Sequence, residues 1–225
     1  MAGVVAILLA AGAGERLGGE EPKGFLRIAG VTILEMAAGS AAASPEVDSL
    51  VVVVPPPYDR RPGPEVGKPL AMVAGGGARQ ESVRLALEAV PDEVETVVVH
   101  DAARCLASPG LFSLVIAALT DADGAIPVVP IRDTVKRVRD GFVVGTEARG
   151  GLAAAQTPQA FRAQTLRDVH AQAAAEGLTF TDDAGMLEWA GYRVAAVPGE
   201  ETNLKVTTPT DLILVEALAA RKAPP

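Results

Sequence analysis

The N-terminal segment combines a glycine-rich loop with two cations, a pattern typical of a binding site for a polyphosphate. The loop that follows the apolar run at residues 4–9 contains Gly12, Gly14 and Arg16, and Lys23 comes shortly after it. Exposed backbone N–H groups beside fixed positive charge are what a phosphate group requires. We therefore interpret this loop as the cradle of a nucleoside triphosphate. The alternative, a glycine-rich turn that binds nothing, accounts less well for the two cations.

Two better-known phosphate-binding loops do not match this segment. The P-loop motif requires a serine or threonine after its lysine, whereas Lys23 is followed by Gly24. The dinucleotide fingerprint G-x-G-x-x-G fits Gly12 and Gly14 but has Leu17 at the position of its third glycine. No acidic residue closes the second expected strand, where that fingerprint needs one for the ribose. A nicotinamide-dependent dehydrogenase is therefore a weak alternative.

A second group of polar residues follows the apolar run at residues 96–99. His100, Asp101 and Arg104 lie there, and ligands of an open parallel sheet bind beyond the carboxyl ends of its strands. A carboxylate at that edge can hold Mg²⁺, which shares oxygen ligands with phosphate, and an arginine can bind a second anion. The competing interpretation makes Asp101 a turn cap that pairs with Arg104 at the surface. We predict that His100 is packed or hydrogen-bonded rather than a catalytic base.

Other candidate residues are ambiguous when each is taken alone. Gly76 and Ser82 belong to a second glycine loop that opens a helix and could meet a base or ribose, although such loops often serve only as turns. Lys205 lies between apolar residues just before a capped helix, where it could face the crevice at the sheet edge or simply be exposed. Arg149 and Thr157 are open to either a functional or a structural interpretation.

Length and composition limit the class of protein. The chain has 225 residues, of which 49% are hydrophobic, and this fits one α/β domain over residues 1–225. The formal net charge of −8 argues against nucleic acid as a partner. Cys105 is the single cysteine, so no internal disulfide can form, and we expect a reducing, cytoplasmic location. No apolar run has membrane-spanning length and the start lacks the basic residues of a signal peptide, so we expect no membrane partner.

Strands and helices that would position these residues alternate along the chain. We predict strands at residues 4–9, 50–54, 70–73, 96–100, 125–129 and 192–197, and helices at 33–43, 80–89, 109–119, 164–175, 182–189 and 209–220. This alternation predicts an α/β fold with an open, mostly parallel twisted sheet and helices on both faces. Thr207 or Thr208 is predicted to cap the last helix, with Pro209 at its first position.

Residues 131–146 interrupt the alternation and are predicted to form a β-hairpin. Asp140 and Gly141 are a strong turn signal between two β-like stretches, of which the first, residues 135–139, is highly charged. One interpretation is a solvated flap on the surface. The other is a β-arm, at about residues 131–147, that reaches a second subunit. The sequence alone does not choose between them.

In this order and at these spacings, the motifs resemble the 2-C-methyl-D-erythritol 4-phosphate cytidylyltransferases of the non-mevalonate isoprenoid pathway. The resemblance extends over nearly the whole chain and rests on residues 9–18, 22–23, 79–83, 100–104, 133–136, 156–159, 161, 181–183 and 203–207. The first loop is shared with sugar nucleotidyltransferases in general, whereas the motifs at 100–104, 157–159 and 205–207 are together more specific. Leu9, Gly77 and Thr202 depart from residues found in other members, and none of these departures removes a proposed catalytic cation.

The resemblance implies a Rossmann-like nucleotidyltransferase fold and transfer of CMP from CTP to 2-C-methyl-D-erythritol 4-phosphate, with release of pyrophosphate. No covalent enzyme intermediate is needed, because the substrate phosphate attacks directly. A homodimer is also implied, in which β-arms complete the neighbouring sites. A ribitol 5-phosphate cytidylyltransferase is the closest alternative, since its family shares most of these motifs. A non-catalytic nucleotide-binding module is the alternative from another class.

The resemblance also implies a role for each matching residue. Arg16 and Lys23 would stabilise the transition state, while Arg149 and Lys205 would position the attacking phosphate. Asp101 would bind Mg²⁺ and face the sugar alcohol. The residues implied to hold the nucleotide are Ala10, Ala11, Gly12, Gly14, Gly76 and Ser82, and those implied to assist at the acceptor are Arg104, Thr134 and Thr157.

Overall fold

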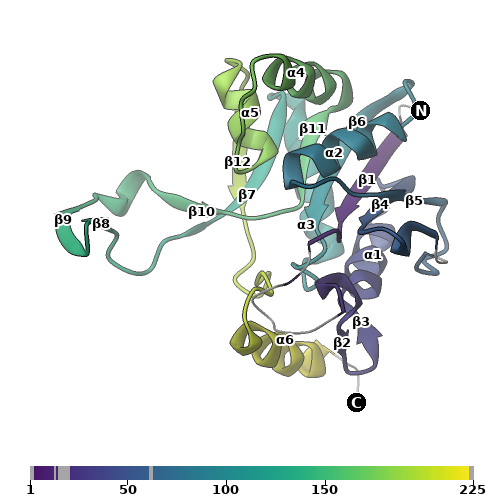
Figure 1. Cartoon of the computed structure of the whole chain (residues 1–225), viewed down its shortest axis with the longest axis horizontal. Helices are drawn as coiled ribbons and strands as arrows, with labels where there is room; N and C mark the ends of the chain where they lie inside the picture. Colours follow the sequence, from purple (N-terminus) through teal and green to yellow (C-terminus); the bar gives the residue numbers. More distant parts are fainter. Residues whose placement is uncertain (1–2, 13, 15–20, 61–62, 223–225) are drawn as a thin grey trace.

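The computed structural model describes residues 3–12, 14, 21–60 and 63–222. A twisted sheet forms the centre of its body (Figure 1), and this sheet has eight strands. Its strands are β1 (Gly3–Leu9), β4 (Ser49–Val54), β5 (Leu70–Ala74), β6 (Val94–Asp101), β7 (Gly124–Pro130), β10 (Ala153–Ala155), β11 (Gln159–Arg162) and β12 (Val194–Pro198). They lie in the order β10–β7–β11–β6–β1–β4–β5, and β12 pairs with β7. The pairs formed among β6, β1, β4 and β5 are parallel, which confirms the predicted open, mostly parallel sheet.

Two short strands of this sheet were not expected from the sequence. β11 lies antiparallel between β6 and β7, and β10 lies antiparallel on the other side of β7. A further small hairpin pairs β2 (Arg27–Ile28) with β3 (Val31–Thr32). β11 matters for the site, because it brings the residues just before it, from Gln156 onward, against the end of β6.

Helices cover both faces of the sheet, as predicted. They are α1 (Ile33–Ala43), α2 (Arg79–Glu88), α3 (Pro109–Ala117), α4 (Ala163–Ala175), α5 (Asp183–Trp189) and α6 (Pro209–Lys222), and short 3-10 turns lie at Lys23–Phe25, Tyr58–Arg60, Ala118–Thr120 and Arg149–Gly151. The predicted cap of α6 is Thr208, whose Oγ1 accepts from the Asp211 N–H over 3.3 Å. None of the helices in the described part of the chain is long and apolar enough to cross a bilayer.

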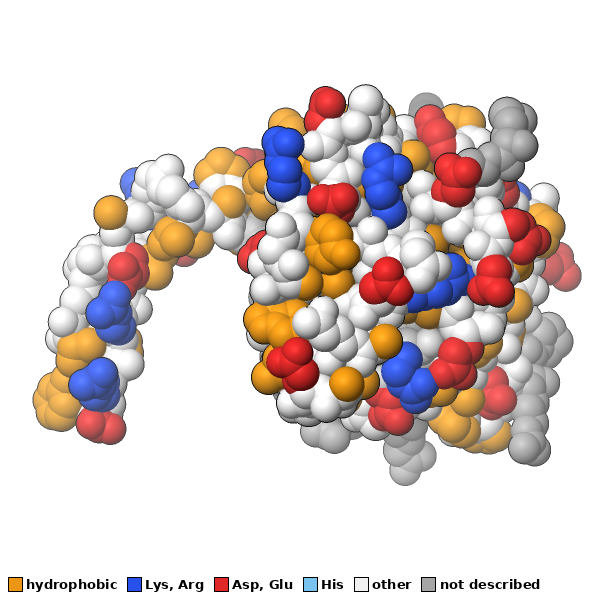
Figure 2. Space-filling model, turned by 90° about the horizontal axis from the view of Figure 1, so that it is seen from above, with side chains coloured by type: hydrophobic (Ala, Val, Ile, Leu, Met, Phe, Trp, Pro, Cys, Tyr) orange, Lys and Arg blue, Asp and Glu red, His pale blue; other side chains and the backbone are white. Residues whose placement is uncertain are grey.

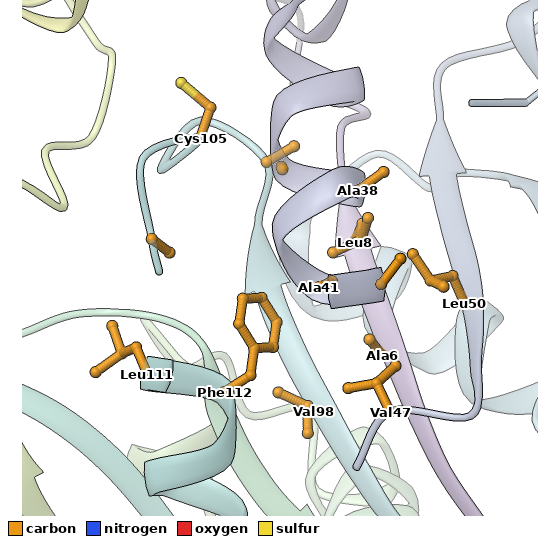
Figure 3. Packing of buried hydrophobic residues seen from close by; sticks show 14 of the residues in the cluster. Ala6, Leu8, Ala38, Ala41, Val47, Leu50, Val98, Cys105, Leu111 and Phe112 are labelled. Carbon is orange, nitrogen blue, oxygen red and sulfur yellow. The ribbon is translucent and has the colours of Figure 1, made fainter. Parts of the chain in front are cut away.

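Alternate residues of β1 separate the core into two hydrophobic clusters. Ala6 and Leu8 pack with residues of α1 and α3 on one face of the sheet. Phe112 of α3 belongs to this cluster (Figure 3). Val5 and Ile7 pack with α2, α4 and α5 on the other face. This period of two is what a strand buried on both faces requires, and it fixes the register in which β1 presents its carboxyl end.

The predicted hairpin exists, and it stands away from the body (Figures 1 and 2). Its strands β8 (Lys136–Arg139) and β9 (Phe142–Thr146) pair antiparallel with each other and with no strand of the main sheet. The backbone φ angles of Asp140 and Gly141 are 49° and 81°, which is the conformation that a two-residue hairpin turn requires. We call residues 131–147 the arm.

Candidate active site

A cleft of about 350 Å³ opens at the carboxyl ends of β1 and β6. Its lining comes from five parts of the chain: the loop after β1, the 3-10 turn that begins at Lys23, the loop and first turn of α2, the end of β6 and the segment before α6. The described residues that line it include Ala10, Ala11, Gly12, Lys23, Gly76, Arg79, Ser82, Asp101 and Lys205. Most residues predicted to hold the nucleotide therefore share one cleft with two of the predicted catalytic cations.

Gly14 of the first glycine loop lies close to Lys23. Gly14 has a φ of +71°, and a Cβ atom built on it would lie 3.0 Å from the Cβ of Lys23, so a larger residue would displace the lysine. Arg16, the other predicted cation of this loop, lies outside the described residues. Glycine therefore suits position 14, where the backbone of the first loop comes close to Lys23.

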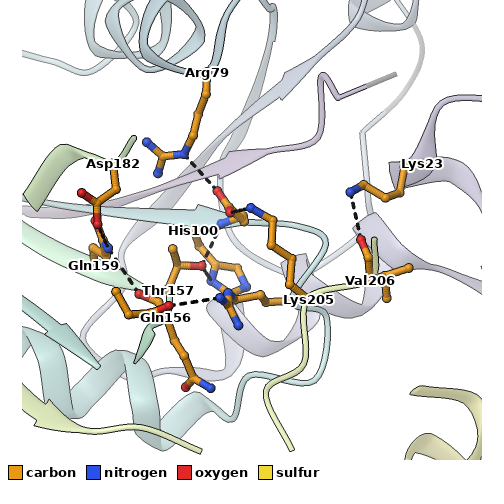
Figure 4. Close-up of polar contacts among 12 residues, drawn as sticks. Lys23, Arg79, His100, Gln156, Thr157, Gln159, Asp182, Lys205 and Val206 are labelled. Atoms are coloured by element: carbon orange, nitrogen blue, oxygen red, sulfur yellow. Dashed lines mark hydrogen bonds and ion pairs between the residues drawn. The ribbon is translucent and has the colours of Figure 1, made fainter. Parts of the chain in front are cut away.

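A hydrogen bond joins Lys23 to the segment that carries Lys205. The Lys23 Nζ donates to the backbone oxygen of Val206 over 2.9 Å (Figure 4). The Val206 N–H in turn donates to the backbone oxygen of Ala103, just after β6, over 2.8 Å. Two cations that lie far apart in the sequence are therefore held in one cleft by a single short segment.

Asp101 is the single acidic residue among the described residues that line the cleft. Its Oδ2 accepts from Lys205 Nζ over 2.6 Å, and its Oδ1 accepts from Arg79 Nε over 3.3 Å. Burial raises the pKa of the Asp101 carboxyl, but the charges of Arg79 and Lys205 outweigh burial and lower the pKa to about 2. The carboxylate is therefore ionised near neutral pH. The alternative in which Asp101 pairs with Arg104 is wrong, because its partners are Arg79 and Lys205.

Asp101 also decides whether a divalent cation fits the cleft. Among the described residues no three acidic, histidine or cysteine side chains gather as a metal site. Mg²⁺ commonly takes one or two carboxylates and completes its shell with substrate phosphates and water. A single ionised carboxylate beside the loop predicted to bind phosphate would fit an ion of that kind.

A layer of buried polar groups supports the cleft from below. His100 is fully buried, packs edge-on against Phe112, and has its Nδ1 2.9 Å from Thr157 Oγ1. Burial lowers the pKa of His100 to about 4, so the ring is neutral near pH 7. The prediction that His100 is packed and hydrogen-bonded is confirmed. Thr157 Oγ1 also accepts from the Asp101 N–H over 3.0 Å, which places this threonine beneath the carboxylate.

Arg104 extends the same layer toward the segment before α6. Its Nη1 donates to the backbone oxygen of Asn203 over 2.8 Å and its Nη2 to that of Ala155 over 3.2 Å. Asn203 is fully buried, and its Nδ2 donates to the backbone oxygen of Thr157 over 2.9 Å. This network holds the segment that carries Lys205 against the start of β11.

Arg149 and Thr134 are not brought into the cleft of their own chain. Thr134 is exposed on the arm, and Arg149 donates to the backbone oxygen of Arg132 where the arm joins the body. Arg149 lines a second hollow, which lies beside β7 and β12 and shares no described residue with the cleft. The resemblance implies a role for both residues at the acceptor, and within a single chain neither lines the cleft.

Sequence reasoning gave no role to Arg79, although the residue lies in one of the motifs. The structure places it in the cleft between two carboxylates, Asp101 and Asp183, with Arg79 Nη1 2.7 Å from Asp183 Oδ2. Asp183 lies 104 positions away along the chain, so no local pattern reveals the contact. The one available signal was the Thr-Asp-Asp motif at residues 181–183, which begins α5.

The fold and the cleft define a class of protein, the α/β proteins that bind a phosphate-bearing ligand at the carboxyl ends of parallel strands. A sequence model of 2-C-methyl-D-erythritol 4-phosphate cytidylyltransferase matches residues 4–221, and the chain belongs to this family. The resemblance found in the motifs is thereby confirmed, and a nicotinamide-dependent dehydrogenase is excluded.

Relatives and solved structures agree with this assignment. The 2-C-methyl-D-erythritol 4-phosphate cytidylyltransferase of Frankia casuarinae is 47% identical over 223 residues, which are 98% of this chain and 83% of the relative. That of Rhodococcus opacus is 46% identical over 222 residues, covering 98% and 96% of the two chains. The crystal structure of the Thermus thermophilus enzyme of the same name has a TM-score of 0.82 at 35% identity, and covers 98% of this chain and 100% of that one.

Proposed function

We propose that this protein transfers CMP from CTP to 2-C-methyl-D-erythritol 4-phosphate and releases pyrophosphate, forming 4-diphosphocytidyl-2-C-methyl-D-erythritol. The observation that carries the proposal is the meeting of Lys23, Asp101 and Lys205 in one cleft beside the loop after β1. Membership of the cytidylyltransferase family supplies the substrates. Residues 10–12 and the second loop at Gly76 would hold the nucleotide, with Ser82 at the start of α2.

The proposed reaction is an in-line displacement at the α-phosphorus of CTP. An oxygen of the acceptor phosphate bonds to this phosphorus, the bond to the bridging oxygen of the β-phosphate breaks, and its electron pair leaves with pyrophosphate. The protein has to align two anions and stabilise charge that develops at the α-phosphate. Lys23, together with Arg16, would stabilise that charge.

Lys205 would hold the attacking phosphate in this scheme. Its ammonium pairs with Asp101 here, and its side chain is 41% exposed, so it can exchange the carboxylate for a phosphate oxygen without leaving the cleft. Asp101 is the residue that would hold Mg²⁺, and the bound ion would neutralise part of the triphosphate charge. The low pKa of Asp101 keeps its carboxyl ionised, so it would not have to release a proton before it binds Mg²⁺.

A second copy of the chain completes the proposed acceptor site. Thr134 lies on the arm and Arg149 lies at its base, and neither lines the cleft of its own chain. The arm also carries exposed apolar side chains that the body does not cover (Figure 2). Phe142 is 74% exposed, and Val138, Val143 and Val144 are also more than half exposed. Apolar groups gathered on a projecting hairpin suit burial against a partner. We therefore propose a homodimer formed through the arm, in which Arg149 and Thr134 act at the partner's cleft.

The proposed unit is one domain over residues 1–225 that acts in the cytoplasm. Val215 of α6 belongs to the same hydrophobic cluster as Ala6 of β1, so the two ends of the described chain share a core. Both proposed substrates are small charged metabolites, and the single cysteine, Cys105, excludes an internal disulfide. These features suit a reducing compartment.

Parallel assays with two acceptors test the proposed function. Purified protein is supplied with CTP and Mg²⁺, and pyrophosphate release is measured with 2-C-methyl-D-erythritol 4-phosphate or with ribitol 5-phosphate. We expect release with the first acceptor and little with the second. Equal or preferred use of ribitol 5-phosphate would overturn the acceptor assignment. Binding of CTP without pyrophosphate release at saturating acceptor would instead identify a non-catalytic nucleotide-binding module.

A further inference from the structure

A continuous series of polar side chains in hydrogen-bond contact leads from the cleft into the layer between the sheet and α4. Lys205 Nζ lies 2.6 Å from Asp101, whose other oxygen lies 3.3 Å from Arg79 Nε. Arg79 Nη1 lies 2.7 Å from Asp183, and the second oxygen of Asp183 lies 2.9 Å from His170 Nε2. The members come from α2, the end of β6, α4, α5 and the segment before α6, so tertiary folding assembles the series.

The inner members of the series are buried. Asp183 is 0% and His170 2% exposed, and both sit beside the apolar cluster that α2, α4 and α5 form against the sheet. Burial raises the pKa of the Asp183 carboxyl, but Arg79 and His170 outweigh burial and lower the pKa, so the group stays ionised. A buried ion pair is often no more stabilising than apolar residues of the same size. Stability of the packing is therefore a poor explanation for it.

Geometry offers a better explanation, because a guanidinium is a rigid planar fork. Arg79 is held at two of its nitrogens by two carboxylates, and its third, Nη2, is buried without a partner among the described residues. Asp183 thus fixes the plane in which Arg79 Nε meets Asp101. When Lys205 turns to a phosphate in the proposed reaction, Arg79 is the cation that still orients Asp101.

We propose that Asp183, with His170 behind it, is a positioning residue that holds Arg79 against Asp101 and away from the bound triphosphate. The inference rests on the proposed function. Without the charge of Asp183, Arg79 has one carboxylate partner left and is drawn to the phosphates of CTP. CTP is then bound at least as tightly, but in a cleft where Asp101 is misoriented. The chemical step is slowed while binding is kept.

Two isosteric variants of neighbouring residues test this role. Asp183→Asn removes the charge that holds Arg79, whereas Asp182→Asn changes the adjacent carboxylate, which caps α5 by accepting from Gly185 N and also accepts from Gln159 Nε2, while the ion pairs of Arg79 are with Asp101 and Asp183. We expect Asp183→Asn to lower kcat about tenfold with a KM for CTP that does not rise, and Asp182→Asn to stay within about twofold of wild type. A rise in the KM of Asp183→Asn, or equal losses in both variants, would overturn the proposal.

A double-mutant cycle shows whether Asp183 acts through Arg79. Arg79→Lys keeps the positive charge but lacks the fork that bridges two carboxylates. If Asp183 acts through Arg79, adding Asp183→Asn to Arg79→Lys lowers kcat by less than about twofold further. Multiplicative losses in the double variant would assign Asp183 a merely structural role and overturn the proposal.

A third variant keeps the test decisive if Asp183→Asn does not fold, as judged by circular dichroism. His170→Leu leaves the Asp183 carboxyl in place beside Arg79 but removes its second partner, and we expect a loss of about threefold in kcat at unchanged KM for CTP. No loss in kcat would overturn the role of the pair. An inactive wild type would refute the proposed function itself, whereas an active wild type with unaffected variants would refute only the positioning role.

Discussion

The cleft and the arm are built on opposite principles. In the cleft, Asp101 has an 11% exposed side chain and meets two cations that the sheet and its helices hold in place. On the arm, Arg137 pairs with Glu147 at side-chain exposures of 67% and 37%, and Phe142 is mostly exposed. Exposed ion pairs contribute little to stability. One chain therefore assembles its cleft by folding, whereas the apolar side chains of the arm stay exposed in the single chain.

The largest expected effect lies in the cleft. Lys23→Ala removes a cation proposed to stabilise charge at the α-phosphate, and loss of one such group typically costs about 3–4 kcal/mol of barrier. We expect the rate of pyrophosphate release to fall roughly 10²–10³-fold, with the thermal unfolding midpoint changed by no more than a few degrees.

Arg84→Ala is the matched control for Lys23→Ala. Arg84 lies on the exposed side of α2 and pairs with Glu88 one turn later, outside the cleft. Its loss should leave turnover near that of wild type. If Lys23→Ala also remained within a fewfold of wild type, the lysine would have no part in the mechanism. The comparison of the cleft with the arm would then describe structure alone and not catalysis.

The next effect tests whether the arm is completed by a partner. Arg149→Ala removes a proposed contact with the acceptor phosphate, and a hydrogen bond to a charged group is worth about 2 kcal/mol, or roughly thirtyfold in rate. Mixed dimers of Arg149→Ala with Lys23→Ala distinguish the two geometries. If Arg149 acts across the interface, one site of each mixed dimer contains both wild-type residues and activity returns. If it acts within its own chain, both sites stay impaired.

How much the sequence predicts differs between the two regions for a physical reason. Apolar runs such as residues 50–54 and the turn at Asp140 and Gly141 are local signals, and the strands and the hairpin that they predict are present. β11 has only four residues of mixed polarity, and its place between β6 and β7 depends on pairing rather than on periodicity. The contact of Arg79 with Asp183 depends on how α2 and α5 pack, which no local pattern encodes.

A smaller effect probes the buried layer beneath the cleft. The pKa of His100 is about 4 rather than 6.5, so the unfolded chain binds a proton here that the folded protein rejects. The contribution of the neutral His100 ring to the free energy of unfolding is therefore present above about pH 6.5 and is lost as the pH falls toward 4. About 2 kcal/mol of that free energy is lost between pH 7 and pH 5. His100→Gln should flatten the pH dependence of the free energy of unfolding, measured in urea, by that amount. An unchanged dependence would show that His100 titrates normally.

The smallest expected effect isolates the apolar surface of the arm. Phe142→Lys places a charge where the proposed interface buries an aromatic ring, and we expect the dimer dissociation constant, measured by sedimentation velocity, to rise about tenfold. Ile213→Lys is the matched control, because Ile213 is 66% exposed on α6 and lies outside the arm. Equal effects of the two variants, or none from Phe142→Lys, would mean that exposed apolar residues of the arm do not mark the interface. A loss confined to Phe142→Lys, with activity falling as dimers dissociate, would show that the exposed surface of the arm and Arg149 at its base serve the same contact.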